Sequence, residues 1–157
     1  MSKMLTHARK DIGLREIKGP ATAPRLSKIL AKYGAWWRDD ETPWCGNIMA
    51  AWADECGHDY PKHYYRALAW ATWGMPSGGP VLGAVAVLSR NGGGHVGMVS
   101  AISQDGLHVR LLGGNQGNAV SEAWFPVHRV SAYRVPYAAR WASAPVLAVG
   151  NISKSEA

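Results

Sequence analysis

One cysteine and one histidine stand in sequence contexts that suit covalent catalysis. Cys45 follows Thr42-Pro43-Trp44, and His95 follows three consecutive glycines. Threonine can cap a helix and proline suits the first helical position, so this segment predicts a helix start with Cys45 in the first turn. Backbone N–H groups and the helix dipole stabilise a thiolate there. We therefore predict Cys45 as a nucleophile and His95 as its base.

The helix that begins near Pro43 also explains Cys45 as a core residue. Residues at 3.6-residue spacing form a stripe that we expect to be buried against a sheet: Cys45, Ile48, Met49, Trp52 and Cys56. Because cysteine is among the most often buried residue types, position alone weighs a core cysteine equally with a nucleophile. Cys56 lies about 16 Å further along the helix axis, too far for a disulfide, and we interpret it as structural.

The strand that starts at His95 predicts how the histidine meets the helix. With a period of two, His95 shares a face with Gly97, Val99 and Ala101. Since Gly97 has no side chain, we expect the helix of Cys45 to approach this face closely. The imidazole would then lie beside the sulfur, as a thiolate–imidazolium pair requires.

A third residue is needed to orient the imidazole, and the turn Gly113-Gly114-Asn115-Gln116 follows the neighbouring strand. The carbonyl of Asn115 can accept the imidazole N–H and fix the tautomer, and Gln116 is the rival for this role. The alternative is that the segment is only a polar turn. Elsewhere, His58 and His63 lie near Cys56, but their spacing matches no four-ligand zinc pattern, so we predict no metal and no cofactor.

The elements that would position these residues change period halfway along the chain. Helices are expected over 3–17, 24–33, about 43–56 and 64–73. Short strands are expected over 84–88, 96–102, 107–112, 120–125 and 130–135. The hairpin signal Gln104-Asp105-Gly106 makes the sheet antiparallel. The prediction is an α+β fold with N-terminal helices packed on a C-terminal antiparallel sheet of about five strands. Residues 1–136 would form one catalytic domain, and 137–157 a C-terminal appendage.

Composition limits the partner class. Lys and Arg number 17 against 11 Asp and Glu, and this excess favours an anionic partner. The basic residues are scattered, so no nucleic-acid groove can be read from them. No apolar run approaches the roughly 20 residues that span a bilayer, so we expect no stable membrane insertion. The first seven residues lack the apolar core of a signal peptide, which predicts that the protein starts in the cytoplasm with free thiols.

Three motifs occur in the order typical of one hydrolase group. Thr42-Pro43-Trp44-Cys45, Gly94-His95-Val96-Gly97 and Gly113-Gly114-Asn115-Gln116 together resemble the CHAP and NlpC-type branch of papain-like peptidoglycan hydrolases, especially its small phage-associated members, over about residues 8–136. In that group a helix-borne cysteine attacks an amide of the wall peptide or its link to the glycan. The resemblance implies a papain-like fold, the catalytic residues Cys45, His95 and Asn115, and substrate contacts from Trp44 and Gln116.

The resemblance also implies a biological role. We expect a monomeric phage endolysin that accumulates in the host cytoplasm and cleaves peptidoglycan in the periplasm, with no nucleic-acid partner. A delivered antibacterial amidase toxin would share the chemistry. The competing class is a non-catalytic module in which Trp36, Trp37, Trp70 and Trp73 line a groove for a glycan or peptide, although such tryptophans are more often core.

Overall fold

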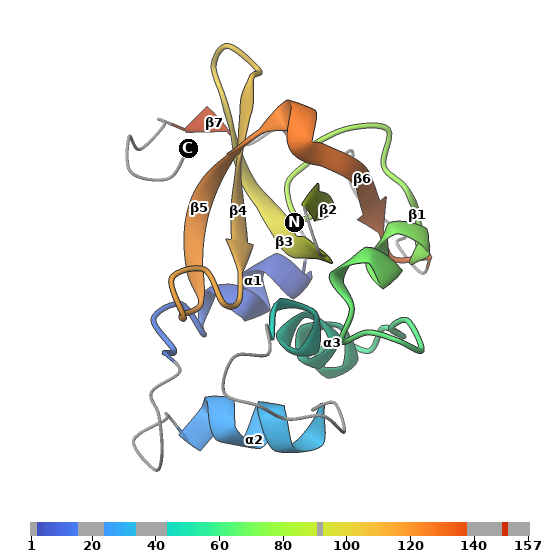
Figure 1. Cartoon of the computed structure of the whole chain (residues 1–157), viewed down its shortest axis with the longest axis vertical. Helices are drawn as coiled ribbons and strands as arrows, with labels where there is room; N and C mark the ends of the chain where they lie inside the picture. The colour runs from blue at the N-terminus through green and yellow to red at the C-terminus, as the bar shows by residue number, and fades with distance from the viewer. Residues whose placement is uncertain (1–2, 16–23, 34–43, 91–92, 138–148, 151–157) are drawn as a thin grey trace.

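The computed structural model describes residues 3–15, 24–33, 44–90, 93–137 and 149–150, and it shows helices followed by a sheet (Figure 1). The α+β class and the antiparallel sheet are therefore confirmed. The helical elements are α1 (Lys3–Arg9), α2 (Pro24–Lys32), α3 (Cys45–Glu55) and the 3₁₀ helices η2 (Ala67–Thr72) and η3 (Val127–Arg129).

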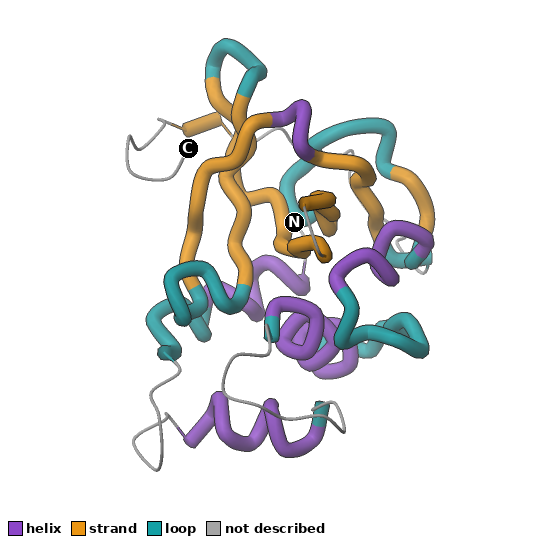
Figure 2. Tube along the Cα trace, viewed as in Figure 1, coloured by secondary structure: helices purple, strands orange, loops and turns teal. Residues whose placement is uncertain are grey.

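The five predicted strands correspond to five strands of one sheet, and two very short strands extend it (Figure 2). They are β1 (Met75–Pro76), β2 (Val85–Arg90), β3 (Gly93–Ser103), β4 (His108–Gly113), β5 (Ser121–Pro126), β6 (Val130–Val135) and β7 (Val149–Gly150). The strand order is β1-β6-β2-β3-β4-β5, and each neighbouring pair is antiparallel. The short β7 pairs in parallel with the end of β3.

The hairpin between β3 and β4 forms where it was predicted. Gly106 adopts a φ of +74°, which suits glycine, and its N–H donates to Ser103 O. The Asp105 carboxylate accepts bonds from the Ser103 hydroxyl at 2.6 Å and from Leu107 N–H at 2.9 Å. These local bonds hold the turn, and the turn aligns the strand of His95 beside β4.

The sheet separates two cores. The larger core joins α1, α2, α3 and η2 to one face of the sheet, and Val96 and Met98 of β3 belong to it together with Cys45. The smaller core lies on the other face and includes Leu88, Val99 and Leu111. His95 is paired across the ladder with Leu88 and therefore begins on the second face.

Helix α3 lies at the centre of the larger core. Figure 1 shows it between the sheet and α2, and α1, α2, β3 and η2 all pack against it. Every residue from Cys45 to Ala53 is buried. The predicted stripe is thus buried as far as Trp52, and Cys56 is half-buried. Because other helices cover the remaining sides, burial extends well beyond the one face that periodicity marked.

Two predicted helices are shorter or tighter in the structure. The first ends at Arg9, and Gly13 to Arg15 instead pair with residues 119–120 through hydrogen bonds that include Gly13 N–H to Val120 O. The helix predicted over 64–73 is a 3₁₀ helix over 67–72. The Trp70 indole donates to Tyr64 O at 3.0 Å, and the turns close with i→i−3 bonds such as Trp73 N–H to Trp70 O.

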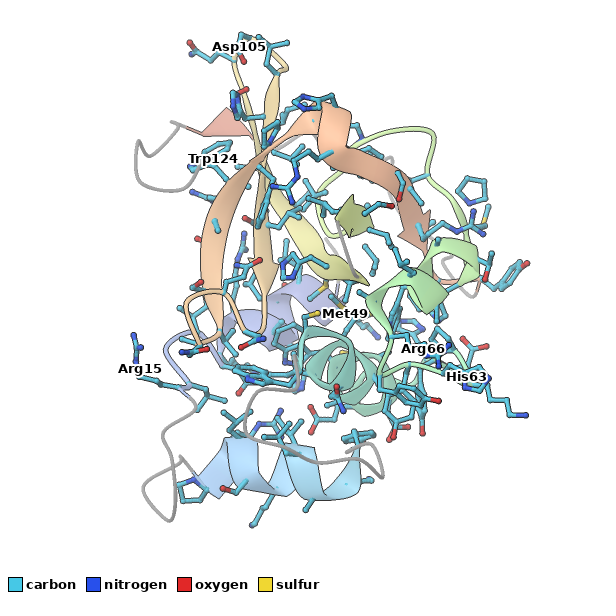
Figure 3. The ribbon with its side chains drawn as sticks, viewed as in Figure 1. Arg15, Met49, His63, Arg66, Asp105 and Trp124 are labelled. Atoms are coloured by element: carbon cyan, nitrogen blue, oxygen red, sulfur yellow. The ribbon has the colours of Figure 1, made fainter. Side chains whose placement is uncertain are left out.

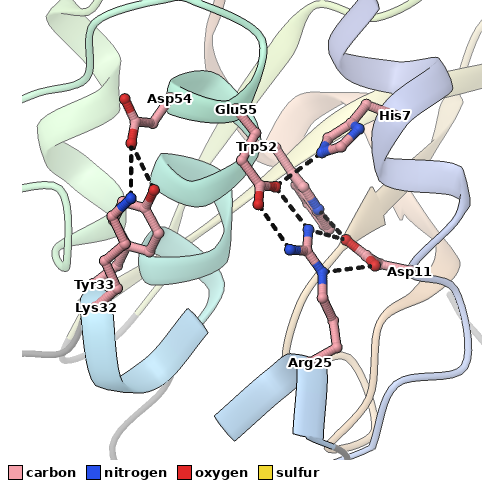
Figure 4. Close-up of polar contacts among 8 residues, drawn as sticks. All are labelled: His7, Asp11, Arg25, Lys32, Tyr33, Trp52, Asp54 and Glu55. Atoms are coloured by element: carbon pink, nitrogen blue, oxygen red, sulfur yellow. Dashed lines mark hydrogen bonds and ion pairs between the residues drawn. The ribbon is translucent and has the colours of Figure 1, made fainter. Parts of the chain in front are cut away.

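A polar network ties the N-terminal helices to the end of α3 (Figure 4). Arg25 of α2 donates to Glu55 at 2.7 Å through two nitrogens and to the buried carboxylate of Asp11 at 3.1 and 3.2 Å. Asp11 also accepts the Trp52 indole N–H at 2.8 Å, and His7 donates to Glu55 at 2.8 Å. Such charge-assisted bonds compensate for the burial of the carboxylates.

In the part of the chain that the structure describes, no helix has both the length and the apolar character needed to cross a bilayer. The same part contains no cluster of three His, Cys, Asp or Glu residues arranged to hold a metal ion.

Replacing Glu55 with glutamine is expected to lower the free energy of unfolding by about 1 to 2 kcal/mol near neutral pH, a range that allows for partial exposure. Hydrogen bonds from Arg25 are the main cause that lowers the pKa of Glu55 to about 2. A carboxylate with a depressed pKa stabilises the fold fully above its ordinary pKa of about 4.3. That stabilisation is lost as the pH falls toward about 2. Urea unfolding across this range should bring the wild type and Glu55→Gln together on acidification.

The matched control is Glu122→Gln, because Glu122 makes only a looser ion pair with Arg110 at 3.7 Å. It should differ little from the wild type at every pH. A gap between wild type and Glu55→Gln that stays constant on acidification would contradict the role assigned to the Arg25–Glu55 pair.

Candidate active site

Cys45 is the first residue of α3 and is 3% exposed. Trp44 occupies the N-cap position without a side-chain capping bond, and the first bond of the helix runs from Ile48 N–H to Trp44 O at 3.1 Å. The amides of the first turn precede the helical ladder and point along the axis, where they favour negative charge. Thr42 and Pro43, the predicted cap and first helical residue, lie outside the described residues.

His95 lies near the start of β3 and is 4% exposed. Its Nε2 is 2.7 Å from Oε1 of Gln116, and its ring lies 5.4 Å from the ring of Phe125 in β5. A buried imidazole needs such a partner, because an unpaired polar group in the interior is costly.

The amide of Gln116 is fixed by its other bonds. Its Nε2 donates to the carbonyl oxygens of Ser121 at 2.8 Å and Leu111 at 3.2 Å. Because Nε2 of this amide points toward the two carbonyl oxygens, Oε1 faces His95. An amide oxygen can only accept a hydrogen bond. His95 therefore donates from Nε2, and Nδ1 is the nitrogen that can take up a proton in the neutral ring.

The amide whose bond to His95 the structure shows is that of Gln116, the rival of Asn115 for the orienting role. Asn115 sits in the left-handed region with φ +59°, a conformation that asparagine tolerates better than most residues. Asn115 shapes the turn after β4, and the side chain of the next residue, Gln116, points back to His95. This geometry favours Gln116 for the orienting role, and the assignment of Asn115 as the third catalytic residue stays a prediction.

Two segments bring the surroundings of Cys45 and His95 together, and the first is Gly113-Gly114. A Cβ on Gly114 would lie 2.5 Å from Ile48 Cγ2 and 2.7 Å from the Trp44 ring, so this glycine is packed against the first turn of α3. A Cβ on Gly113 would lie 2.9 Å from Gln116 Oε1, the atom that binds His95. The two glycines are adjacent, with Cα atoms about 3.8 Å apart.

The second segment is 64–68, which leads from the loop after α3 into η2. The backbone carbonyl of Tyr64 occupies the space that a Cβ on Gly46 would need. Further along, the side chain of Leu68 would lie 2.7 Å from a Cβ on Gly94. Gly46 follows Cys45 and Gly94 precedes His95, so one short segment contacts the neighbours of both residues.

These contacts correct the predicted role of Gly97. The helices pack on the face of Val96 and Met98, and a Cβ on Gly97 would instead meet Leu111 Cβ at 3.1 Å and Leu112 O at 3.2 Å. The close approach of the segment after β4 to α3 depends on Gly114, whereas Gly46 admits the backbone of Tyr64 and Gly94 admits the side chain of Leu68. In the sequence Gly46 and Gly94 are next to Cys45 and His95, and Gly113 and Gly114 precede Gln116 by three and two residues.

The tryptophans of the described segments are mainly structural. The ring of Trp44, a predicted substrate contact, is 3% exposed and lies against Gly114. Trp70 and Trp73 are buried, and their indoles donate to Tyr64 O and Asp59 O, so they do not line a groove. Trp36 and Trp37 lie outside the described residues.

No protein-family model, curated protein or solved structure matches the chain. The chemistry of the site is therefore argued from its own residues. A thiol at a helix N-terminus and an imidazole held in a defined tautomer are the groups that acyl transfer through a thioester needs.

Gly46→Ala is expected to lower the free energy of unfolding by about 1 to 3 kcal/mol, because the added methyl group would overlap a backbone carbonyl that cannot move alone. Gly93→Ala is the matched control, since nothing lies within 4 Å of its Cβ position. Urea unfolding of both variants tests this packing, and equal stability of the two would contradict it.

The tautomer of His95 is a second prediction. Long-range proton–nitrogen NMR spectra near neutral pH should show its hydrogen on Nε2, and Gln116→Ala should shift or broaden that signal because the acceptor is lost. Asn115→Ala should leave the signal in place. A change caused by Asn115→Ala alone would restore Asn115 as the orienting residue.

Proposed function

We propose that the chain is a papain-like cysteine hydrolase that cleaves an amide bond of the peptidoglycan peptide, of the kind that phages use to lyse their hosts. Cys45 is the nucleophile, His95 the base, and Gln116 the residue that orients the base. The observation that carries this proposal is the His95–Gln116 hydrogen bond with its fixed amide. It gives a buried histidine the tautomer that a general base acting through Nδ1 requires.

The position of Cys45 supports the same assignment. A structural cysteine could occupy any buried site, yet this one stands at the first residue of the central helix, where the dipole favours a thiolate. His95 shares its strand face with Leu88, opposite the core that contains Cys45, so the support comes from the two packing segments described above, which join the neighbours of Cys45 to those of His95 near the start of β3. Cys56 offers the contrast, because burial is the main cause that raises the pKa of its thiol.

The proposed reaction proceeds in two steps. The Cys45 thiolate attacks the scissile carbonyl, and N–H groups of the first turn of α3 stabilise the oxyanion. The C–N bond breaks as His95 gives a proton to the leaving amine, and a thioester remains. His95 then takes a proton from water, which attacks the thioester, releases the carboxylic acid and restores the thiol. No added oxidant or cofactor is needed for this balance.

The excess of basic residues, 17 against 11 acidic ones, is consistent with a wall polymer that carries carboxylates. The same charge would suit a non-catalytic wall-binding module. Release of cleaved products distinguishes the two classes, because a module binds sacculi without cutting them.

Cys45→Ala is expected to abolish the release of soluble muropeptides from purified sacculi while the protein stays folded. Gln116→Ala should lower the rate on the order of 10- to 100-fold, since the base remains but loses its orientation. Mass spectrometry of the products would identify the bond that is cut.

The matched control for the nucleophile is Cys56→Ala, which removes the other thiol of the chain and should remain lytic. Full activity of Cys45→Ala would refute the thiol mechanism. Absence of muropeptide release by the wild type on sacculi of varied chemotype would refute the hydrolase itself.

A further inference from the structure

We propose that Lys62, His63 and Arg66, with the ring of Tyr65 among them, form a subsite that binds the carboxylate-bearing peptide of the wall polymer. We call these four residues the basic ledge. The inference rests on the proposed function for the identity of the ligand. Figure 3 shows the side chains of His63 and Arg66 close together beside the loop that follows α3.

The ledge is exposed and charged. The side chains of Lys62, His63 and Arg66 face solvent, whereas Tyr65 is half-buried. The loop 57–66 contains one acidic residue, Asp59, against the two permanent cations Lys62 and Arg66. An arginine beside a lysine suits a carboxylate, because guanidinium binds both oxygens and the ammonium adds a second charge.

Aromatic contacts hold the ledge in one shape. His63 Nδ1 lies 2.9 Å from the Tyr65 hydroxyl, and the Arg66 guanidinium lies 6.0 Å from the Tyr65 ring centroid. Tyr64 packs edge-on against Tyr60 at 5.4 Å, and its carbonyl accepts the Trp70 indole N–H. A surface that is already ordered loses little conformational entropy when a ligand binds.

The ledge continues into the candidate active site. The Tyr64 carbonyl is packed against Gly46, next to the proposed nucleophile. Leu68, which is 47% exposed, lies against Gly94 next to the proposed base. A peptide bound with its carboxylate on Arg66 could therefore pass over exposed apolar surface at Leu68 on the way to the reacting groups. This placement makes the ledge a substrate subsite and not a remote charged patch.

The test measures binding without catalysis. Lys62→Glu/Arg66→Glu is made in the full chain carrying Cys45→Ala, and its affinity for purified sacculi is measured by sedimentation. The matched control is Arg9→Glu/Lys28→Glu, which makes the same charge change at two exposed positions on α1 and α2. Sacculi with free carboxylates and sacculi with amidated carboxylates serve as the two probes.

The ledge variant should bind native sacculi about tenfold more weakly than the control variant. Amidation should weaken binding of the parent chain but have little further effect on the ledge variant. Equal binding by the ledge and control variants would overturn the proposal, as would undiminished binding of the parent chain to amidated sacculi. A ledge variant that loses affinity for double-stranded DNA while still binding sacculi would also overturn it.

Failure of the ledge and failure of the proposed function give different results. If the chain with Cys45 intact released no muropeptides while the binding results held, the hydrolase would be refuted and the ledge would stand. If muropeptides were released and the ledge variant bound like its control, the ledge would be refuted and the hydrolase would stand.

Discussion

The first turn of α3 is held from two sides by contacts that only glycine permits. On one side the Tyr64 carbonyl lies where a Cβ of Gly46 would be, and on the other Gly114 lies against Trp44 and Ile48. Interiors packed at such density transmit a displacement instead of absorbing it. The location of Cys45 relative to the sheet is therefore set by contacts in which the backbone of a glycine packs directly against its neighbour.

The far end of the same helix is held by a different kind of force. Arg25, Asp11 and Glu55 join α2 and the segment after α1 to the last turn of α3 through charged hydrogen bonds. Packing at the N-terminus is insensitive to salt and pH, whereas the network at the C-terminus responds to both. Acid is thus expected to loosen the helical layer from the end of α3 that lies away from Cys45.

Periodicity predicted the elements well and their mutual arrangement less well. The alternation in β3 placed His95 with Gly97 and Val99, and the structure agrees. The strand is apolar on both faces, since Val96 and Met98 alternate with Val99 and Ala101. A period of two therefore does not tell which face the helices cover: they cover the face of Val96 and Met98, and not the predicted face of His95 and Gly97. Only tertiary packing decides between two apolar faces.

The choice between Asn115 and Gln116 depends on tertiary structure for a similar reason. Asn115 and Gln116 both carry amides. Sequence spacing does not reveal that Asn115 adopts a left-handed φ, nor that the side chain of Gln116 reaches His95. The candidate nucleophile and base follow from residue types and local context. The glycines that join them follow only from contacts between segments far apart in the chain.

The choice of an uncharged amide as the partner of His95 has a consequence for the electrostatics of the ring. Gln116 Oε1 accepts the Nε2 hydrogen in both the imidazole and the imidazolium form, so the bond survives a change of charge. A carboxylate in the same place would favour the cation strongly and resist the return to neutrality. The amide holds the direction of the ring without selecting its charge, so in the proposed mechanism the ring would keep one orientation while it gains and loses a proton.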